Sequence, residues 1–189
     1  MSKRSIEEMS QSSNTCLVIF HFIVLLTYIV YLDKIQNILL LIAMESEAKP
    51  LLTHLNLNPI DSQFNHSQHK LFSGTYNGAS ITVAINGKSP EFNVDNVGTV
   101  PAALTTFLAI QQLQPDIVIN AGTAGGFKRK TAEIGDSFIG TEIKNHDRRI
   151  PIPGFTEYGI GSYTSVKSPH LVKVLACLLL LTTFTRHNF

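Results

Sequence analysis

The sequence is poor in cysteine, tryptophan and charge: among 189 residues there are two cysteines, no tryptophan and 15% charged side chains. Cys16 and Cys177 lie far apart, and neither belongs to a C-x-x-C pair or stands near a ligand-spaced histidine. A disulfide scaffold and a zinc module are therefore excluded. The net charge of +1 offers no basic face for nucleic acid. With 44% hydrophobic residues, the composition predicts a folded globular domain.

Hydrophobic residues are concentrated in one run near the N-terminus. Residues 16–32 read CLVIFHFIVLLTYIVYL without a formal charge. As a helix they would span about 26 Å, just short of the roughly 30 Å hydrocarbon layer of a membrane. Lys3 and Arg4 are offset by Glu7 and Glu8, and no small-residue cleavage motif follows, so a cleaved secretory signal is not expected. The run can be a membrane anchor, a buried segment, or a segment outside the folded unit.

Two shorter apolar runs predict strands buried on both faces. Ile38–Met44 reads ILLLIAM and Asp116–Ala121 reads DIVINA, which is typical of parallel strands covered by helices. Glu45–Leu55 is predicted to be a helix, because Pro50 falls early enough in it to be tolerated. The side of this helix that faces inward would carry Leu51, Leu52 and Leu55.

A hairpin and a second helix are predicted between these strands. Lys70–Tyr76 and Ser80–Asn86 flank Asn77-Gly78, a dipeptide that favours the tight turn of a β-hairpin. Residues 97–113 then have a helical pattern. Buried strands linked through a hairpin and a helix predict an α/β domain with a mixed central sheet.

In such sheets ligands bind beyond the carboxyl ends of the strands, which selects residues 44–47 and 122–126. The glycines of the second segment let the backbone approach a ligand, and Thr123 adds a hydroxyl. A carboxylate from Glu45 or Glu47 near that loop could act as a general base on water. Both features have simpler explanations: acidic residues in a first helical turn complement the helix dipole, and a glycine cluster can be an ordinary turn.

Other motifs do not hold. Gly87-Lys88-Ser89 resembles the tail of a phosphate-binding loop, but Thr82 stands where that motif needs a glycine. His66 and His69 are three apart in a polar stretch without nearby carboxylates, so an exposed loop is favoured over a metal site. We expect neither a metal nor a cofactor.

Four ordered segments carry a family resemblance: residues 43–47 (AMESE), 95–102 (DNVGTVPA), 115–127 (PDIVINAGTAGGF) and 146–153 (HDRRIPIP). Together they resemble the plant type of 5′-methylthioadenosine/S-adenosylhomocysteine nucleosidase, within the purine nucleoside and uridine phosphorylase superfamily. The resemblance implies a homodimeric three-layer α/β fold located in the cytoplasm. It also implies hydrolysis of the bond between adenine and ribose in methylthioadenosine, a step of methionine salvage that needs no cofactor.

The resemblance assigns roles to particular residues. Glu47 matches the glutamate that activates the attacking water. Thr123 matches the hydroxyl residue that contacts the nucleoside, within a substrate-binding loop that also includes Gly122, Ala124 and Gly125. Residues 146–153 resemble the loop that helps to close the alkylthio end of the pocket in the neighbouring subunit. An anionic carboxylate and a held water suit a transition state resembling an oxocarbenium ion.

The resemblance runs only from residue 38 to residue 175, so we expect a partial phosphorylase-like domain there. Residues 1–37 and 176–189 would be a foreign N-terminal segment and a foreign apolar tail. The family's adenine-protonating aspartate and its Met-Glu pair have no counterpart, and none of Asp116, Asp136 and Asp147 stands in that acid motif. The fold would then be incomplete at its C-terminus and the chain inactive.

Two alternatives stay open at this point. The chain could be a non-catalytic nucleoside-binding or storage relative, as the missing acid suggests. It could also be a membrane-tethered fragment, associated with a membrane through residues 16–32 rather than located in the cytoplasm.

Overall fold

The structure, a computed structural model, describes residues 35–64, 67–145 and 148–165. The chain divides into two compact units, Met1–Gly135 and Asp136–Phe189. The apolar run at 16–32 and the tail at 176–189 lie outside the described residues, so the anchor and tail predictions are not tested by the structure. Within the described ranges, no helix combines the length and the apolar character that a membrane crossing requires.

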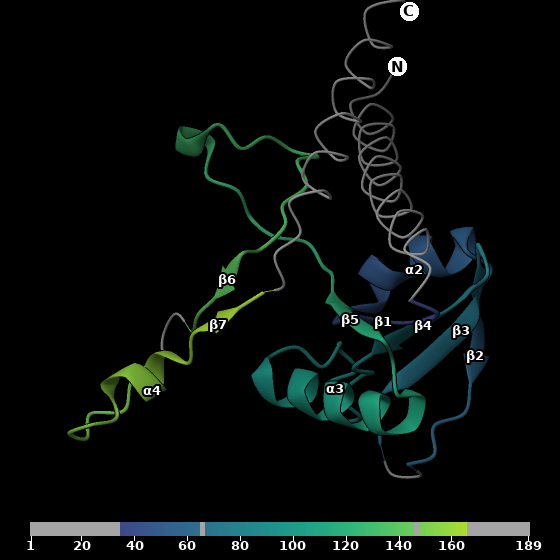
Figure 1. Cartoon of the computed structure of the whole chain (residues 1–189), viewed down its shortest axis with the longest axis horizontal. Coiled ribbons are helices and arrows are strands. Elements are labelled where there is room, and N and C mark those ends of the chain that lie inside the picture. Colours follow the sequence, from purple (N-terminus) through teal and green to yellow (C-terminus); the bar gives the residue numbers. More distant parts are fainter. Residues whose placement is uncertain (1–34, 65–66, 146–147, 166–189) are drawn as a thin grey trace, which may run out of the picture. The chain divides into compact units, whose positions relative to one another are not determined.

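The first unit is built on a mixed five-stranded sheet (Figure 1). In spatial order its strands are β2 (Asn58–Ile60), β3 (Lys70–Tyr76), β4 (Ala79–Ile85), β1 (Asn37–Ile42) and β5 (Ile117–Asn120). Strand β1 runs parallel to β4 and to β5, whereas β3 is antiparallel to β2 and β4. The predicted mixed sheet is confirmed.

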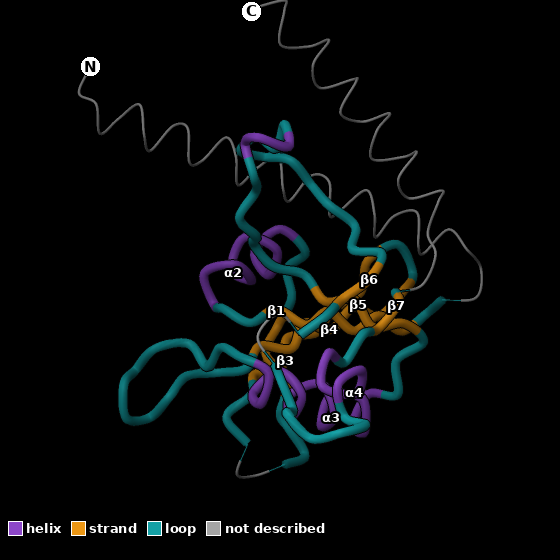
Figure 2. Tube along the Cα trace, turned by 90° about the vertical axis from the view of Figure 1, so that its left-hand side faces the viewer, coloured by secondary structure: helices purple, strands orange, loops and turns teal. Residues whose placement is uncertain are grey.

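Strand β1 lies inside the sheet because its side chains are apolar on both faces. Ile38, Leu39 and Leu40 are all fully buried, and each face is covered by one helix, as Figures 1 and 2 show. Helix α2 (Glu45–His54) packs on the side of Ile38 and Leu40, and helix α3 (Thr99–Leu113) packs on the side of Leu39.

The inward residues predicted for the first helix are confirmed. Leu51 and Leu55 are buried, and Leu52 is partly buried against the same apolar cluster. Pro50 is the sixth of the ten residues, so it removes one backbone donor from the interior of the helix rather than from its first turn.

The predicted hairpin is also confirmed. Strands β3 and β4 pair from Lys70 opposite Ile85 to Tyr76 opposite Ala79. Asn77 and Gly78 between them have φ angles of 49° and 86°, and positive φ at both positions is the mark of the tight hairpin turn that Asn-Gly favours.

Two predictions about strands need correction. Strand β5 was expected to be buried on both faces, but it is the edge strand and its residues are alternately half-buried and exposed, with Val118 40% exposed. The helices pack on β1 and β4 and leave β5 partly uncovered. The edge strand β2 was not predicted, because Pro59 disfavours a strand except at an edge.

The remaining short elements follow β5. A 3₁₀ turn, η1 (Lys128–Lys130), lies in the loop of the first unit. The described part of the second unit contains β6 (Glu142–Ile143), helix α4 (Thr156–Ile160) and β7 (Tyr163–Thr164), with β6 and β7 paired antiparallel.

Candidate functional site

The first turn of α2 begins directly beyond the carboxyl end of β1. Its N-cap residue Met44 is extended and has no side-chain oxygen for the free backbone N–H groups of the turn. Two acidic residues, Glu45 and Glu47, lie in this turn. Their carboxylates have different partners: Glu47 contacts the glycine-rich loop, and Glu45 contacts two lysines.

Glu47 contacts the glycine-rich loop. Its Oε1 accepts hydrogen bonds from the backbone N–H of Thr123 at 2.9 Å and from the Thr123 hydroxyl at 2.6 Å. A Cβ atom added to Gly122 would lie 3.5 Å from Oε2 of Glu47, so the carboxylate also borders this glycine. Because β1 and β5 are parallel neighbours, with Leu41 paired to Asn120, their carboxyl ends meet and bring the two predicted segments together.

The other two predicted loop residues lie outside this contact. Ala124 and Gly125 are exposed in the loop, and a Cβ atom added to Gly125 would have no atom within 4 Å. The contact with Glu47 is thus made by Gly122 and Thr123, and a ligand role for Ala124 and Gly125 stays a prediction.

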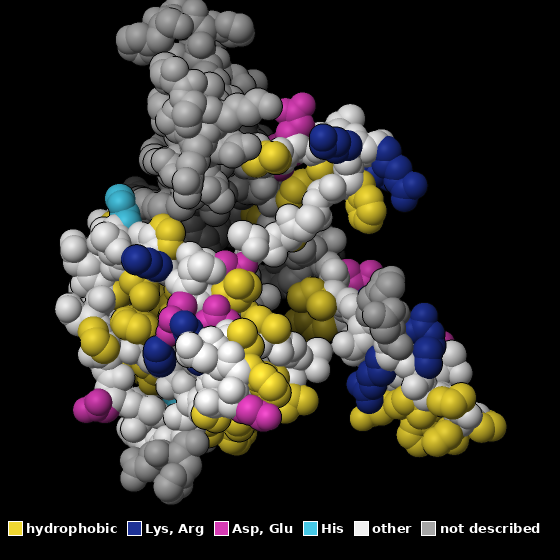
Figure 3. Space-filling view, turned by 180° about the vertical axis from the view of Figure 1, so that it is seen from behind, with side chains coloured by type: hydrophobic (Ala, Val, Ile, Leu, Met, Phe, Trp, Pro, Cys, Tyr) yellow, Lys and Arg dark blue, Asp and Glu magenta, His cyan; other side chains and the backbone are white. Residues whose placement is uncertain are grey.

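Glu45 points to the other side of β1 and forms two ion pairs. Lys70, at the start of β3, contacts its Oε1, and Nζ of Lys88 lies 3.1 Å from its Oε2. Hydrogen bonding to Lys70, and then to Lys88, lowers the pKa of the Glu45 carboxyl below its ordinary value. Figure 3 shows acidic and basic side chains side by side on one face of this unit.

Local sequence patterns did not predict these lysines. They stand 25 and 43 positions after Glu45. The hairpin register gives a signal in retrospect, since Lys70 pairs with Ile85 at the end of the hairpin and Lys88 follows three residues later.

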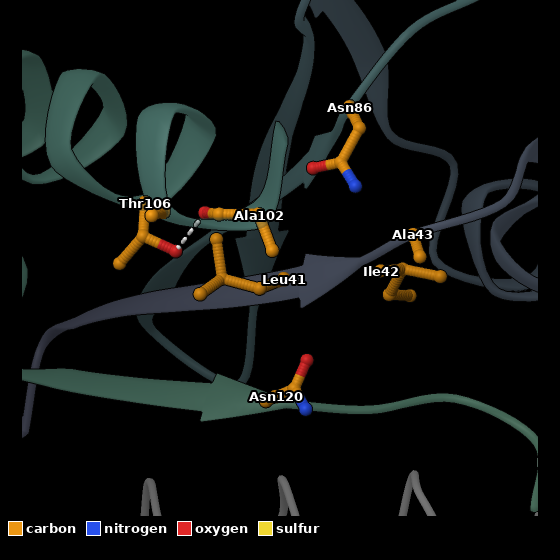
Figure 4. Close-up of a pocket in the computed structure, with 8 residues that line it drawn as sticks. Leu41, Ile42, Ala43, Asn86, Ala102, Thr106 and Asn120 are labelled. Atoms are coloured by element: carbon orange, nitrogen blue, oxygen red, sulfur yellow. Dashed lines mark hydrogen bonds between the residues drawn. The ribbon is translucent and has the colours of Figure 1, made fainter. Parts of the chain in front are cut away.

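A hollow of about 250 Å³ lies beside these strand ends on the α3 side (Figure 4). Its lining consists of Leu41, Ile42, Ala43, Asn86, Ala102, Ala103, Thr106 and Asn120. Asn86 is buried, and its Nδ2 donates to the Asn96 carbonyl at 2.8 Å. Sequence reasoning assigned a role to neither asparagine: Asn86 directly follows β4 outside any known motif, and Asn120 belongs to segment 115–127 without a function of its own there. The hollow is apolar apart from a few polar groups, as small-molecule sites are.

The aspartates considered as alternative acids fall elsewhere. Oδ2 of Asp116 accepts hydrogen bonds from the backbone N–H groups of Gln36 and Asn37, each at 2.8 Å. It therefore joins the amino ends of β5 and β1, away from Glu47. Asp136 belongs to the second unit, and Asp147 lies outside the described residues.

The predicted histidine loop is only partly described. His69 is buried rather than exposed: its ring contacts the Ser67 hydroxyl, and its Nε2 lies 3.1 Å from the Ser62 hydroxyl. Burial lowers the pKa of this imidazole. His66 lies outside the described residues. In the described part of the chain, no group of three or more His, Cys, Asp or Glu side chains is placed to hold a metal ion.

Known proteins resemble this chain in sequence. The family model of the phosphorylase superfamily matches residues 37–183. The 5′-methylthioadenosine nucleosidase of Arabidopsis thaliana is 44% identical over 146 residues, which cover 76% of this chain and 55% of that protein. An Arabidopsis thaliana 5′-methylthioadenosine/S-adenosylhomocysteine nucleosidase is 41% identical over 75% of this chain and 56% of its own length.

Solved structures agree in fold. The apo structure of the Arabidopsis thaliana 5′-methylthioadenosine nucleosidase superposes with a TM-score of 0.72 at 42% identity, over 75% of this chain and 59% of that one. The nucleosidase of Neisseria meningitidis in complex with methylthio-immucillin-A gives 0.51 at 27% identity, over 68% of this chain and 52% of that one. The chain spans little more than half the length of the curated plant relatives that it matches. The resemblance to the plant nucleosidases is confirmed, and the chain belongs to the phosphorylase superfamily.

Proposed function

We propose that the first unit contributes the water-activating side of a nucleosidase site for 5′-methylthioadenosine. The observation that carries this proposal is the contact of Glu47 with Thr123 where the carboxyl ends of β1 and β5 meet. This is where an open α/β sheet binds its ligands, and the relatives named for this substrate share the fold.

The reaction requires a base for water and an acid for adenine. Glu47 would take a proton from water while the water oxygen bonds to the anomeric carbon of the ribose. The bond from that carbon to adenine breaks, and its electron pair goes to adenine, which must receive a proton from an acid. The products are adenine and methylthioribose. The Glu47 carboxylate also stabilises the positive charge that develops on the ribose.

Thr123 holds the Glu47 carboxylate in place. Its N–H and O–H both donate to the same oxygen of Glu47, which leaves Oε2 for water. The Thr123 hydroxyl oxygen keeps lone pairs that can accept from a hydroxyl of the ligand. This use of Thr123 agrees with the nucleoside contact that the resemblance implies.

The test is adenine release from 5′-methylthioadenosine. We expect background turnover from the 189-residue chain, because Asp116 is occupied at the far end of the sheet and none of Asp116, Asp136 and Asp147 stands in the family's acid motif. A chimera in which residues 1–175 continue into the corresponding remainder of the Arabidopsis relative should turn over.

In the chimera, Glu47→Gln should lower kcat by about 10²- to 10⁴-fold while leaving nucleoside binding in place, because the amide cannot take a proton. The matched control is Glu91→Gln, an exposed carboxylate beyond β4. Turnover by the Glu47→Gln chimera would show that Glu47 is not the general base. A chimera that binds nucleoside without turnover would favour a binding protein.

The proposal includes a second copy of the chain on α3. The outward side of this helix exposes Val100, Leu104 and Phe107 by 77%, 55% and 59%, and the helix contains no charged residue. A two-fold interface joins the same surface patch of both copies, and residues near the axis meet their own copies, where like charges would repel. An uncharged apolar helix therefore suits self-association. The homodimer implied by the resemblance would use this surface.

Cytoplasmic location also stays a prediction, which cell fractionation tests.

A further inference from the structure

Glu45 stands at a junction of three chain segments at the start of α2. Its carboxylate binds Lys70 of β3 and Lys88 of the loop after β4, and its backbone N–H lies 3.4 Å from Oδ1 of Asp95. We propose that Glu45 is a positioning residue, which fixes the first turn of α2 so that the carboxylate of Glu47 stays against Thr123. The catalytic use of Glu47 rests on the proposed function, whereas the positioning can be measured without turnover.

The start of α2 needs outside support. A helix leaves its first four N–H groups without partners in the helix, and Met44 supplies no side-chain acceptor for them. Asp95 supplies one from a distant segment. The residues nearest in sequence therefore do little to fix the direction in which the helix starts.

The partners of Glu45 are themselves held by the sheet. Lys70 pairs with Ile85 in the β3–β4 hairpin. Lys88 and Asp95 face each other as an isolated bridge, and the Asn96 N–H donates to the Gly87 carbonyl at 2.9 Å. Glu45 thus ties the first turn to segments whose positions are set by backbone hydrogen bonds.

The two carboxylates hold the helix start from opposite sides. In the sheet order β3-β4-β1-β5, Glu45 reaches over the β4 side of β1 and Glu47 reaches over its β5 side. A rotation or shift of the first turn that released the lysines would also carry Glu47 away from Thr123. The ion pairs are half exposed, with the Lys70 and Lys88 side chains 51% and 40% accessible, so their effect should be on position more than on stability.

The experiment follows the Thr123 amide by NMR in the full 189-residue chain. This N–H donates to Glu47, so its proton shift and exchange rate report the contact directly. We compare the wild type with Glu45→Gln, Lys88→Gln and Glu47→Gln. The control is Glu91→Gln, which removes a carboxylate from the loop containing Lys88 and Asp95.

In Glu45→Gln the Thr123 proton signal should move part of the way towards its position in Glu47→Gln, and the amide should exchange about two- to tenfold faster. Lys88→Gln should give a smaller change of the same sign, and Glu91→Gln none. If Glu45→Gln unfolds the chain, the milder Lys88→Gln still tests the proposal through the proton shift and exchange rate of the Thr123 amide.

A Thr123 signal that stays at its wild-type position in both folded variants would overturn the proposal, even if their stability falls. A shifted signal together with an inactive chimera would leave the positioning role standing and count against the proposed function. The two failures are therefore distinguishable.

Discussion

Helices α2 and α3 cover opposite faces of one sheet, but they are built differently. Below α2 lies the larger buried cluster, to which the helix contributes Ala48, Leu51 and the adjoining Leu55. Below α3 the buried cluster is small, and the helix contributes Ala109 to it. The outward side of α2 is polar, whereas the outward side of α3 exposes Leu104 and Phe107.

This difference indicates that the two faces serve different purposes, one in stability and the other in association. On the α2 side the apolar residues of the helix are buried in the larger cluster, and the first turn of the helix carries Glu47. The α3 face is thinly packed and leaves apolar surface that a monomer rarely exposes in one place. Stability should therefore depend on the α2 side and association on the α3 side.

The largest expected effect is a cavity below α2. Leu51 is 5% exposed. Its replacement by alanine should lower the free energy of unfolding of the chain by about 2–4 kcal/mol. Leu104→Ala, at a position 55% exposed, should change it by less than about 0.5 kcal/mol. Urea unfolding of both variants checks this contrast, and equal losses would mean that the two faces do not differ as described.

Next in size is the effect of a charge on the α3 surface. Phe107→Glu should weaken self-association by about 2 kcal/mol, roughly thirtyfold in Kd, because it places like charges across a two-fold contact. Sedimentation equilibrium measures the change. Thr53→Glu on the exposed side of α2 is the control and should leave the dimer intact. Association unaffected by Phe107→Glu would mean that another surface joins the copies.

A smaller effect concerns pH and His69. Burial lowers the pKa of His69 in the folded chain, while the unfolded chain takes up this proton near the usual 6.5. The unfolded state therefore binds more protons as the pH falls below about 6.5, and stability declines there. His69→Gln should flatten this part of the pH profile of urea unfolding. A profile unchanged by His69→Gln would contradict the burial of its ring.

The smallest effect is that of Lys88→Gln on stability. Its ion pair with Glu45 is partly exposed, so the loss of unfolding free energy should be below about 1 kcal/mol and should vanish near 1 M salt. Thermal melts at low and high salt measure it. A loss above about 2 kcal/mol would make the Glu45 junction a principal source of stability rather than a positioning contact.

Much of this arrangement follows from local patterns in the sequence. Residues 38–42 are apolar without interruption, which favours a buried strand, and Asn77-Gly78 favours the hairpin turn. The parallel neighbours β1 and β5 then bring Glu47 to Thr123, because the carboxyl ends of parallel strands share one edge.

What the sequence did not predict depends on tertiary contacts. Lys70 meets Glu45 only once the hairpin register is set, and Asn86 lines the hollow only because β4 ends beside β1. The exposure of β5 could not be read from DIVINA either, since a strand at an edge and a strand inside a sheet can have the same apolar composition.

The uncapped start of α2 has a consequence for the order of folding. The helix has ten residues, includes Pro50 and lacks a side-chain cap, so it is too short to be stable alone. It becomes stable only once the sheet has formed and has brought Lys70 of β3, Lys88 and Asp95 from the loop after β4, and Thr123 after β5 to its first turn. Glu47 is therefore among the last groups to be fixed during folding, and in mild denaturant it should be released while the sheet is still intact.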